Sequence, residues 1–179
     1  VGVLRAGTSQ RALGLRADMD ALPMHEHTGL PHASVNADAF HGCGHDGHVA
    51  MLLAAAEELA RTRCFDGVIH FIFQPAEENV AGGKRMVEEG LFELFPVDAV
   101  FGMHNMPGLD RGKLYFRDGA MMAAVDNWEI ELTGKGSHGS MPELSIDPVV
   151  AGASLVMALQ TIVSRNVSPH NSAVVTVGA

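Results

Sequence analysis

The sequence has little of what several classes of protein require. Two cysteines cannot form a disulfide framework, and one of them, Cys43, lies among histidines, which favours a reducing, cytoplasmic compartment. Lysine and arginine form no run and the formal net charge is -9, so nucleic acid and membranes are poor partners. We find no apolar stretch that approaches a membrane span, no signal-peptide pattern and no internal repeat. At 179 residues the chain is long enough for one core, or for one domain and part of another.

Positions 41–48 hold three histidines, one cysteine and one aspartate, with glycines between them. Glycine has no Cβ, so the backbone can fold tightly enough to direct Cys43 and His45 toward one point. Thiolate and imidazole together suit zinc and other late divalent metals. A flexible polar turn with solvated histidines is the alternative interpretation, but the density of ligands favours a metal site.

Hydrophobic patterning predicts alternating strands and helices in the first two thirds of the chain. The predicted elements are strands at 1–5 and 12–17, a long loop at 24–40, a helix at 47–61, a strand at 67–74, a short helix at 83–89 and a strand at 99–103. The first two strands are interpreted as a hairpin, and the continuous apolar run of the third predicts burial on both faces. This order is typical of an α/β fold with a mostly parallel sheet and flanking helices.

Carboxylates and a histidine follow the ends of the predicted strands. Asp18 and Asp20 end one strand, Glu77 and Glu78 follow the next, and His104 follows the last. The ligand cluster opens a helix at the same edge. Because ligands gather outside the carboxyl ends of parallel strands, we expect these residues to converge. Taken alone, the two glutamates would be an ordinary acidic helix N-terminus.

The last third of the chain has a different pattern. Trp128–Leu132 alternates apolar and acidic residues, which predicts a half-exposed antiparallel strand. Asp147 and Pro148 predict the N-cap and first turn of a helix that runs to about Ser164. A further strand is predicted at 172–177. A β-α-β order of this kind indicates the start of a second, α+β domain.

Five motifs together resemble the M20 metallopeptidase family, in particular its branch of hippurate hydrolases, N-acyl-amino-acid deacylases and auxin-conjugate hydrolases. The motifs are 15–23, 41–48, 74–78, 102–105 and 134–138. The resemblance implies a phosphorylase/hydrolase-like α/β catalytic domain that is interrupted by a ferredoxin-like satellite domain used for dimerisation. On this basis residues 1–122 are predicted to be catalytic and residues 123–179 to begin the satellite domain, both incomplete, in a chain that is a fragment.

The resemblance also implies which residues form the site. Cys43, His45, Glu78 and His104 would be ligands of two divalent ions, which could be zinc, manganese, nickel or cobalt. Glu77 would be the general base. A carboxylate beside a metal-activated water can accept its proton and return it to the leaving amine, whereas a carboxylate fixed on the metal cannot do so freely.

The supporting residues are assigned in the same way. Asp20 resembles an aspartate that orients a histidine ligand, and His138 resembles a histidine that stabilises the oxyanion in the partner subunit's site. An exposed loop histidine is the alternative for His138. Other branches carry a histidine ligand at about the position of Asp18, so its role stays open. His48 is expected to be a packing or hydrogen-bonding group, and the last metal ligand is expected beyond Ala179.

The expected function is hydrolysis of the amide bond of a small N-acyl amino acid, of the hippurate type, by a metal-dependent homodimer. One alternative is a metal-binding or assembly domain without turnover, or an inactive fragment of the hydrolase. Another is a carboxypeptidase or dipeptidase of the same family. A structural zinc site is disfavoured because compact CxxC pairs are absent from the sequence.

Overall fold

The structure, a computed structural model, describes residues 1–178, apart from the side chains of residues 79 and 80. It divides into two compact units, Val1–Leu114 and a second that begins at Tyr115. The predicted domain boundary after residue 122 stays a prediction.

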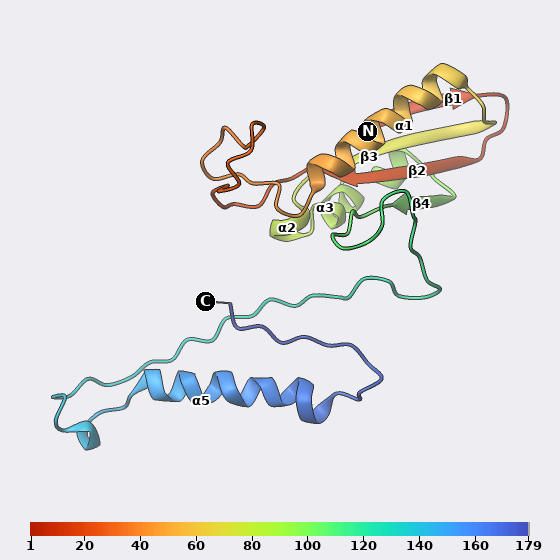
Figure 1. Cartoon of the computed structure of the whole chain (residues 1–179). Helices are drawn as coiled ribbons and strands as arrows, with labels where there is room; N and C mark the ends of the chain where they lie inside the picture. The colour runs from red at the N-terminus through yellow and green to blue at the C-terminus, as the bar shows by residue number, and fades with distance from the viewer. Residues whose placement is uncertain (179) are drawn as a thin grey trace. The chain divides into compact units, whose positions relative to one another are not determined.

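The first unit contains a four-stranded sheet with helices on its faces (Figure 1). The strands are β1 (Gly2–Ala6), β2 (Ala12–Asp18), β3 (Gly67–Gln74) and β4 (Ala99–Gly102). The helices are α1 (His45–Thr62), α2 (Glu77–Val80), α3 (Gly82–Glu88) and α4 (Leu91–Leu94). A predicted long loop, residues 24–40, is confirmed, and hydrogen bonds between Leu22 and Phe40 close it. The short helices α2 and α4 were not predicted.

The sheet has the strand order β1-β3-β2-β4. Strand β2 is parallel to both β3 and β4, which confirms the mostly parallel α/β fold, whereas β1 runs antiparallel to β3. The predicted hairpin is therefore wrong, because β3 lies between the first two strands. Strand β3 is buried along most of its length and takes a central position. Asp66 accepts hydrogen bonds from the backbone N–H groups of Thr8 and Ser9, which tie the first turn to the start of β3.

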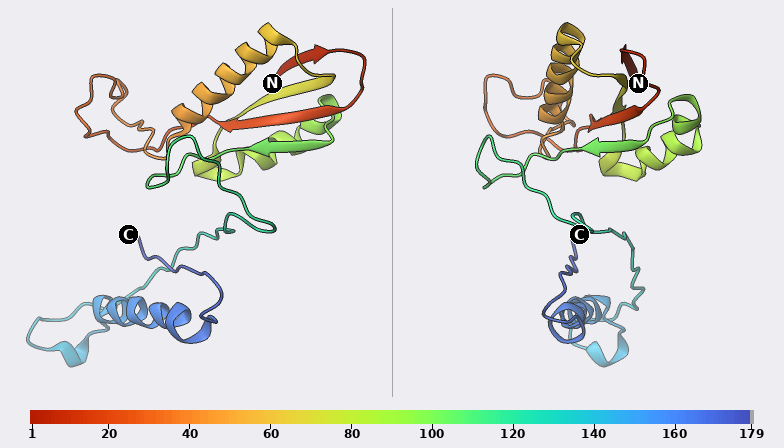
Figure 2. Two further views of the ribbon diagram at one scale, coloured as in Figure 1. Left: turned by 45° about the vertical axis from the view of Figure 1, so that its right-hand side comes forward. Right: turned by 90° about the vertical axis from the view of Figure 1, so that its right-hand side faces the viewer.

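Helix α1 and helix α3 lie on opposite faces of the sheet (Figure 2). On one face Ile69 and Phe71 pack with Ala17 and with Leu52 of α1, which forms the buried core. On the other face Ile72 lines an apolar recess together with residues of α3 and α4. Helix α1 is thus fixed against the sheet, and its N-terminus lies at the carboxyl ends of β2 and β3.

Leu52→Ala is expected to lower the free energy of unfolding by about 2–5 kcal/mol, measured by urea denaturation. Leu52 is 7% exposed and packs in the core, so truncation leaves a cavity as well as removing buried apolar surface. Leu53 is the matched control, because it is the same residue type one position along α1 but is 55% exposed. Leu53→Ala should change stability by no more than about 0.5 kcal/mol. Equal effects of the two substitutions would contradict the placement of the core.

The second unit is built around helix α5 (Pro148–Thr161), as predicted. Asp147 caps it by accepting hydrogen bonds from the backbone N–H groups of Val149 and Val150, at 2.8 and 3.3 Å. A π-helical turn, Ile162–Asn166, follows. The strands predicted at Trp128–Leu132 and at 172–177 are not formed: within the described part of this unit only Lys135 and Ile146 form a β-bridge. A strand exists only with a hydrogen-bonded neighbour, and alternation alone does not supply one.

The helix and turn together, Pro148–Asn166, comprise 19 residues with a mean hydropathy of 1.3. By length and composition this segment could cross a membrane. The sequence-based expectation that no stretch approaches the length of a membrane span is therefore wrong. Core helices of soluble proteins pass the same test, so the expectation of no membrane partner stays a prediction.

Candidate metal centre

The centre is organised by a tight turn at the start of α1. Gly44 precedes the helix with φ of 82°, a left-handed conformation that favours glycine. A Cβ at this position would lie 2.2 Å from the Asn105 side chain, so only glycine fits. The turn places Cys43 just before the helix and His45 at its first residue, where the His45 side chain is 1% exposed.

A second tight turn places the two glutamates. After β3 ends, Ala76 adopts φ of 51°, which costs on the order of 1–3 kcal/mol for a residue with a Cβ. Helix α2 starts immediately afterwards with Glu77 and Glu78. Asp20, which follows β2, accepts a hydrogen bond from the backbone N–H of Glu78 at 3.0 Å. The ends of β2 and β3 are thereby linked through the site.

His45 is at the centre of the arrangement. Its Nδ1 lies 2.9 Å from the backbone carbonyl of Asp20, to which it can donate, and 3.3 Å from the Asp20 carboxylate. This bond leaves Nε2 as the unprotonated nitrogen. Nε2 lies 3.8 Å from Glu78, 4.0 Å from Glu77 and 3.8 Å from Asp18, and it has no hydrogen-bond partner among the described residues.

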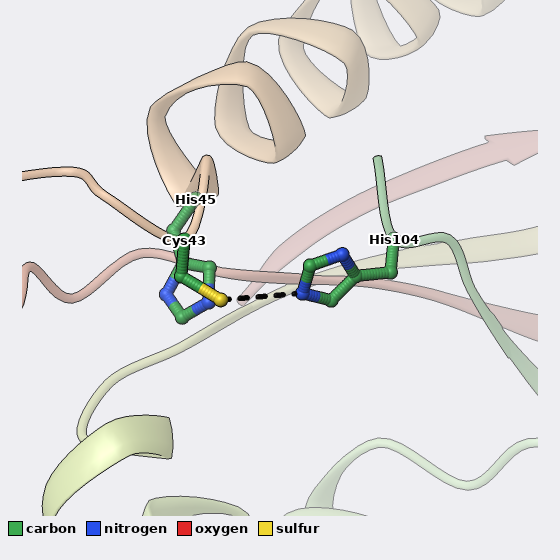
Figure 3. Close-up of side chains that lie close together, drawn as sticks. All are labelled: Cys43, His45 and His104. Atoms are coloured by element: carbon green, nitrogen blue, oxygen red, sulfur yellow. Dashed lines mark hydrogen bonds between the residues drawn. The ribbon is translucent and has the colours of Figure 1, made fainter. Parts of the chain in front are cut away.

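Cys43 and His104 complete the cluster (Figure 3). The Cys43 Sγ points toward His104 and lies 3.5 Å from its Nε2. The His104 Nδ1 lies 2.6 Å from the backbone carbonyl of Asn105, which leaves Nε2 free to accept or to coordinate. One ligand atom from each of Cys43, His45 and His104 lies within 4.8 Å of the others, and the same holds for His45, Glu77 and Glu78.

These residues fit divalent metal ions. Buried polar atoms are nearly always hydrogen-bonded, yet His45 Nε2 and Glu78 Oε1 are buried without partners in the part of the chain that the structure describes. These two atoms lie 3.8 Å from each other. Thiolate, imidazole and carboxylate are the ligand types of zinc and related ions.

The groups around Cys43 carry negative charge. Burial, contact with the Glu78 carboxylate and the charges of Glu77 and Asp18 raise the pKa of the Cys43 thiol to about 11. Without a metal the thiol therefore stays protonated at neutral pH. Burial also raises the pKa of Asp20, but hydrogen bonds from the backbone of Glu78 and Glu77 outweigh it, so this pKa lies below its ordinary value.

Asp18, whose role the sequence left open, is 1% exposed and fully engaged by protein groups. One oxygen lies 2.5 Å from His48 Nδ1, and the other forms an ion pair with Arg16 at 2.8 Å. Burial raises the pKa of Asp18, but the His48 hydrogen bond and the charge of Arg16 outweigh it, so the pKa lies below its usual value. The prediction that His48 is a hydrogen-bonding group is confirmed.

His138 belongs to the second unit, in an exposed loop that the Lys135–Ile146 bridge closes. The backbone N–H of Ser140 lies 3.2 Å from the His138 Nδ1, and the Ser140 hydroxyl lies 2.8 Å from it. A backbone N–H can only donate, so Nδ1 is the acceptor and the proton of the neutral ring is on Nε2.

The structure brings together six of the seven predicted site residues, namely Asp20, Cys43, His45, Glu77, Glu78 and His104, all in the first unit. The seventh, His138, lies in the second unit. Sequence reasoning missed the contribution of Asn105, which contacts both Gly44 and His48. An asparagine after a strand has no local pattern that could have indicated this contribution.

Known proteins resemble this chain along its whole length. Residues 14–177 match Peptidase family M20/M25/M40. The chain belongs to the M20 family. It is 54% identical over all 179 residues to hippurate hydrolase of Campylobacter jejuni, of which it covers 46%. It is 47% identical over 175 residues, 97% of its length, to N-acetyl-L-cysteine deacetylase of Bacillus subtilis, of which it covers 42%. This M20 chain thus spans about half the length of the curated relatives it matches.

Solved M20 structures share the fold. The chain matches the crystal structure of a proposed aminohydrolase from methicillin-resistant Staphylococcus aureus with a TM-score of 0.71 and 41% identity, over 99% of this chain and 47% of that one. It matches the Bacillus subtilis YXEP protein, a dinuclear metal binding peptidase from the M20 family, with a TM-score of 0.56 and 42% identity, over 60% of this chain and 30% of that one.

Proposed function

We propose that this chain carries metal-binding residues of a hydrolase that cleaves the amide bond of N-acyl amino acids. The observation that carries the proposal is the buried His45 Nε2, which has no hydrogen-bond partner among the side chains and backbone that the structure describes and lies 4.0 and 3.8 Å from Glu77 and Glu78. Two divalent ions would be held by Cys43, His45, Glu78 and His104. The dinuclear neighbour supports two ions, and the names of the deacetylase and hippurate hydrolase relatives support the substrate class.

The residues of the chain divide the chemistry between them. When bound, divalent ions lower the pKa of a water molecule and polarise the amide carbonyl. Glu77 accepts the proton of the attacking water, whose oxygen forms the new bond to the carbonyl carbon. The C–N bond then breaks, and Glu77 returns the proton to the leaving nitrogen. The products are a carboxylic acid and a free amino acid.

His138 would donate from Nε2–H to the oxyanion that develops on the carbonyl oxygen. The hydrogen bond from the Ser140 backbone to Nδ1, which leaves Nε2 as the donor of the neutral ring, supports this role. We extend the proposal to a homodimer in which His138 acts on the partner subunit's substrate. Light scattering of the full-length protein tests the dimer, and a monomer that retains full activity would contradict it.

The proposal is tested by assaying the full-length protein with N-benzoylglycine and N-acetyl amino acids. We expect hydrolysis that is lost after chelation and restored by Zn²⁺ or Mn²⁺. The side chains of the ligand cluster cannot themselves activate the water and polarise the carbonyl as the ions do. Dipeptides are the comparison substrates, and preferential cleavage of dipeptides would support the peptidase alternative instead. Metal binding without hydrolysis of any of these amides would overturn the proposal and favour an inert metal-binding domain.

A further inference from the structure

Behind the ligand cluster lies a buried pair that the proposed mechanism does not use. Asp18 and His48 are 1% and 2% exposed, and their hydrogen bond is 2.5 Å long. Asp18, His45 and His48 are close enough to form a metal site of their own. However, both oxygens of Asp18 already have protein partners, His48 for one and Arg16 for the other.

The other ring nitrogen of His48, Nε2, connects the Asp18–His48 pair to Asn105. The backbone N–H of Asn105 lies 2.9 Å from His48 Nε2 and can only donate, and the side-chain Oδ1 of Asn105 lies 3.0 Å from the same nitrogen. Nε2 is therefore the acceptor, and Nδ1–H donates to Asp18. The same backbone N–H belongs to the peptide group that joins His104 to Asn105. His48 thus holds the backbone of a residue in the ligand cluster.

Asn105 is held at its other end as well. Its side-chain amide lies 3.3 Å from the carbonyl oxygen of Gly44, beside the turn that carries Cys43. Its own carbonyl lies 2.6 Å from the Nδ1 of His104, which directs the Nε2 of that ring toward Cys43. A continuous series of hydrogen bonds therefore runs from Asp18 through His48 and Asn105 to His104.

We propose that His48, oriented by Asp18, is a positioning residue that fixes the His104–Asn105 peptide and so holds the His104 imidazole against Cys43. This inference rests on the proposed metal-dependent function. It also assigns Asp18 a role in this chain, as the hydrogen-bond acceptor that keeps Nε2 of His48 unprotonated. Mutation of a residue that holds a metal ligand in place commonly weakens metal affinity by about 10–100-fold.

The test compares two substitutions at one position in the full-length protein. His48→Phe keeps an aromatic ring beside His104, whose centroid is 4.5 Å from that of His48, but removes both hydrogen bonds. We expect its dissociation constant for Zn²⁺, measured by competition with a chelator, to rise about 10–100-fold. His48→Gln offers one donor and one acceptor and is expected to restore most of the affinity. His32→Phe, at an exposed histidine, is the control and should leave the affinity unchanged.

Wild-type affinity in a folded His48→Phe protein would overturn the proposal, as would equal losses with Phe and Gln. If His48→Phe does not fold, nitrogen-15 spectra of the wild-type protein decide. We expect the proton of His48 on Nδ1, and a proton on Nε2 of the neutral ring would overturn the proposal. Amide hydrolysis is measured separately from metal affinity, so this inference and the proposed function can fail independently.

Discussion

Glu77→Gln in the full-length protein is expected to lower the turnover number on N-acyl amino acids by about 10²–10⁴-fold while metal content stays unchanged. Glu77 lies at the start of α2 with its carboxylate 4.0 Å from His45 Nε2, and its side chain is 44% exposed. It is therefore close to the cluster but accessible to water and substrate. Glutamine keeps the size and polarity of the side chain but cannot accept and return the proton.

The measurement pairs steady-state kinetics with elemental analysis of the same samples. Glu57→Gln is the matched control, because Glu57 is exposed on α1 and outside the cluster. That substitution should change neither turnover nor metal content. Near-normal turnover of Glu77→Gln with metals retained would exclude Glu77 as the general base. A loss of metal together with activity would indicate instead that Glu77 is a ligand.

The sequence was sufficient to predict that the site lies at the carboxyl ends of the parallel strands. The apolar run at Gly67–Gln74 is β3 with the predicted bounds, and parallel pairing of β2, β3 and β4 brings their carboxyl ends together. Residues that follow those ends must then lie near one another, wherever they occur along the chain. For this reason Asp20, Glu78 and His104 were found without knowledge of the contacts between them.

Features that depend on distant partners could not be predicted in this way. Strand β1 pairs with β3 rather than with its neighbour β2, and nothing in its own residues distinguishes the two pairings. Asn105 acts through contacts with His48 and Gly44, which precede it by 57 and 61 positions in the chain. The alternation at Trp128–Leu132 is a local pattern, but a strand also needs a neighbour, and the described part of the second unit supplies none there.

Cys43→Ser is expected to weaken metal affinity by more than the roughly 10–100-fold that is typical when a hydrogen-bond partner of a ligand is removed, because Cys43 is a proposed ligand itself. Serine is nearly the same size, but its hydroxyl stays protonated and is a poor ligand for soft metals. Cys64→Ser is the matched control, since Cys64 is the other free cysteine and is exposed. Unchanged metal content in Cys43→Ser after dialysis would refute the ligand role of Cys43.

The pH dependence of metal binding gives an independent test of the same residue. In the metal-free chain the pKa of the Cys43 thiol is raised to about 11, so the thiol is protonated throughout the neutral range. Coordination requires the thiolate, and each binding event must therefore release this proton. Metal affinity should then rise with pH, by about tenfold per unit from this group alone between pH 6 and 8. In Cys43→Ser that contribution is lost, and the slope should fall accordingly, whereas in Cys64→Ser it should stay as in the wild type.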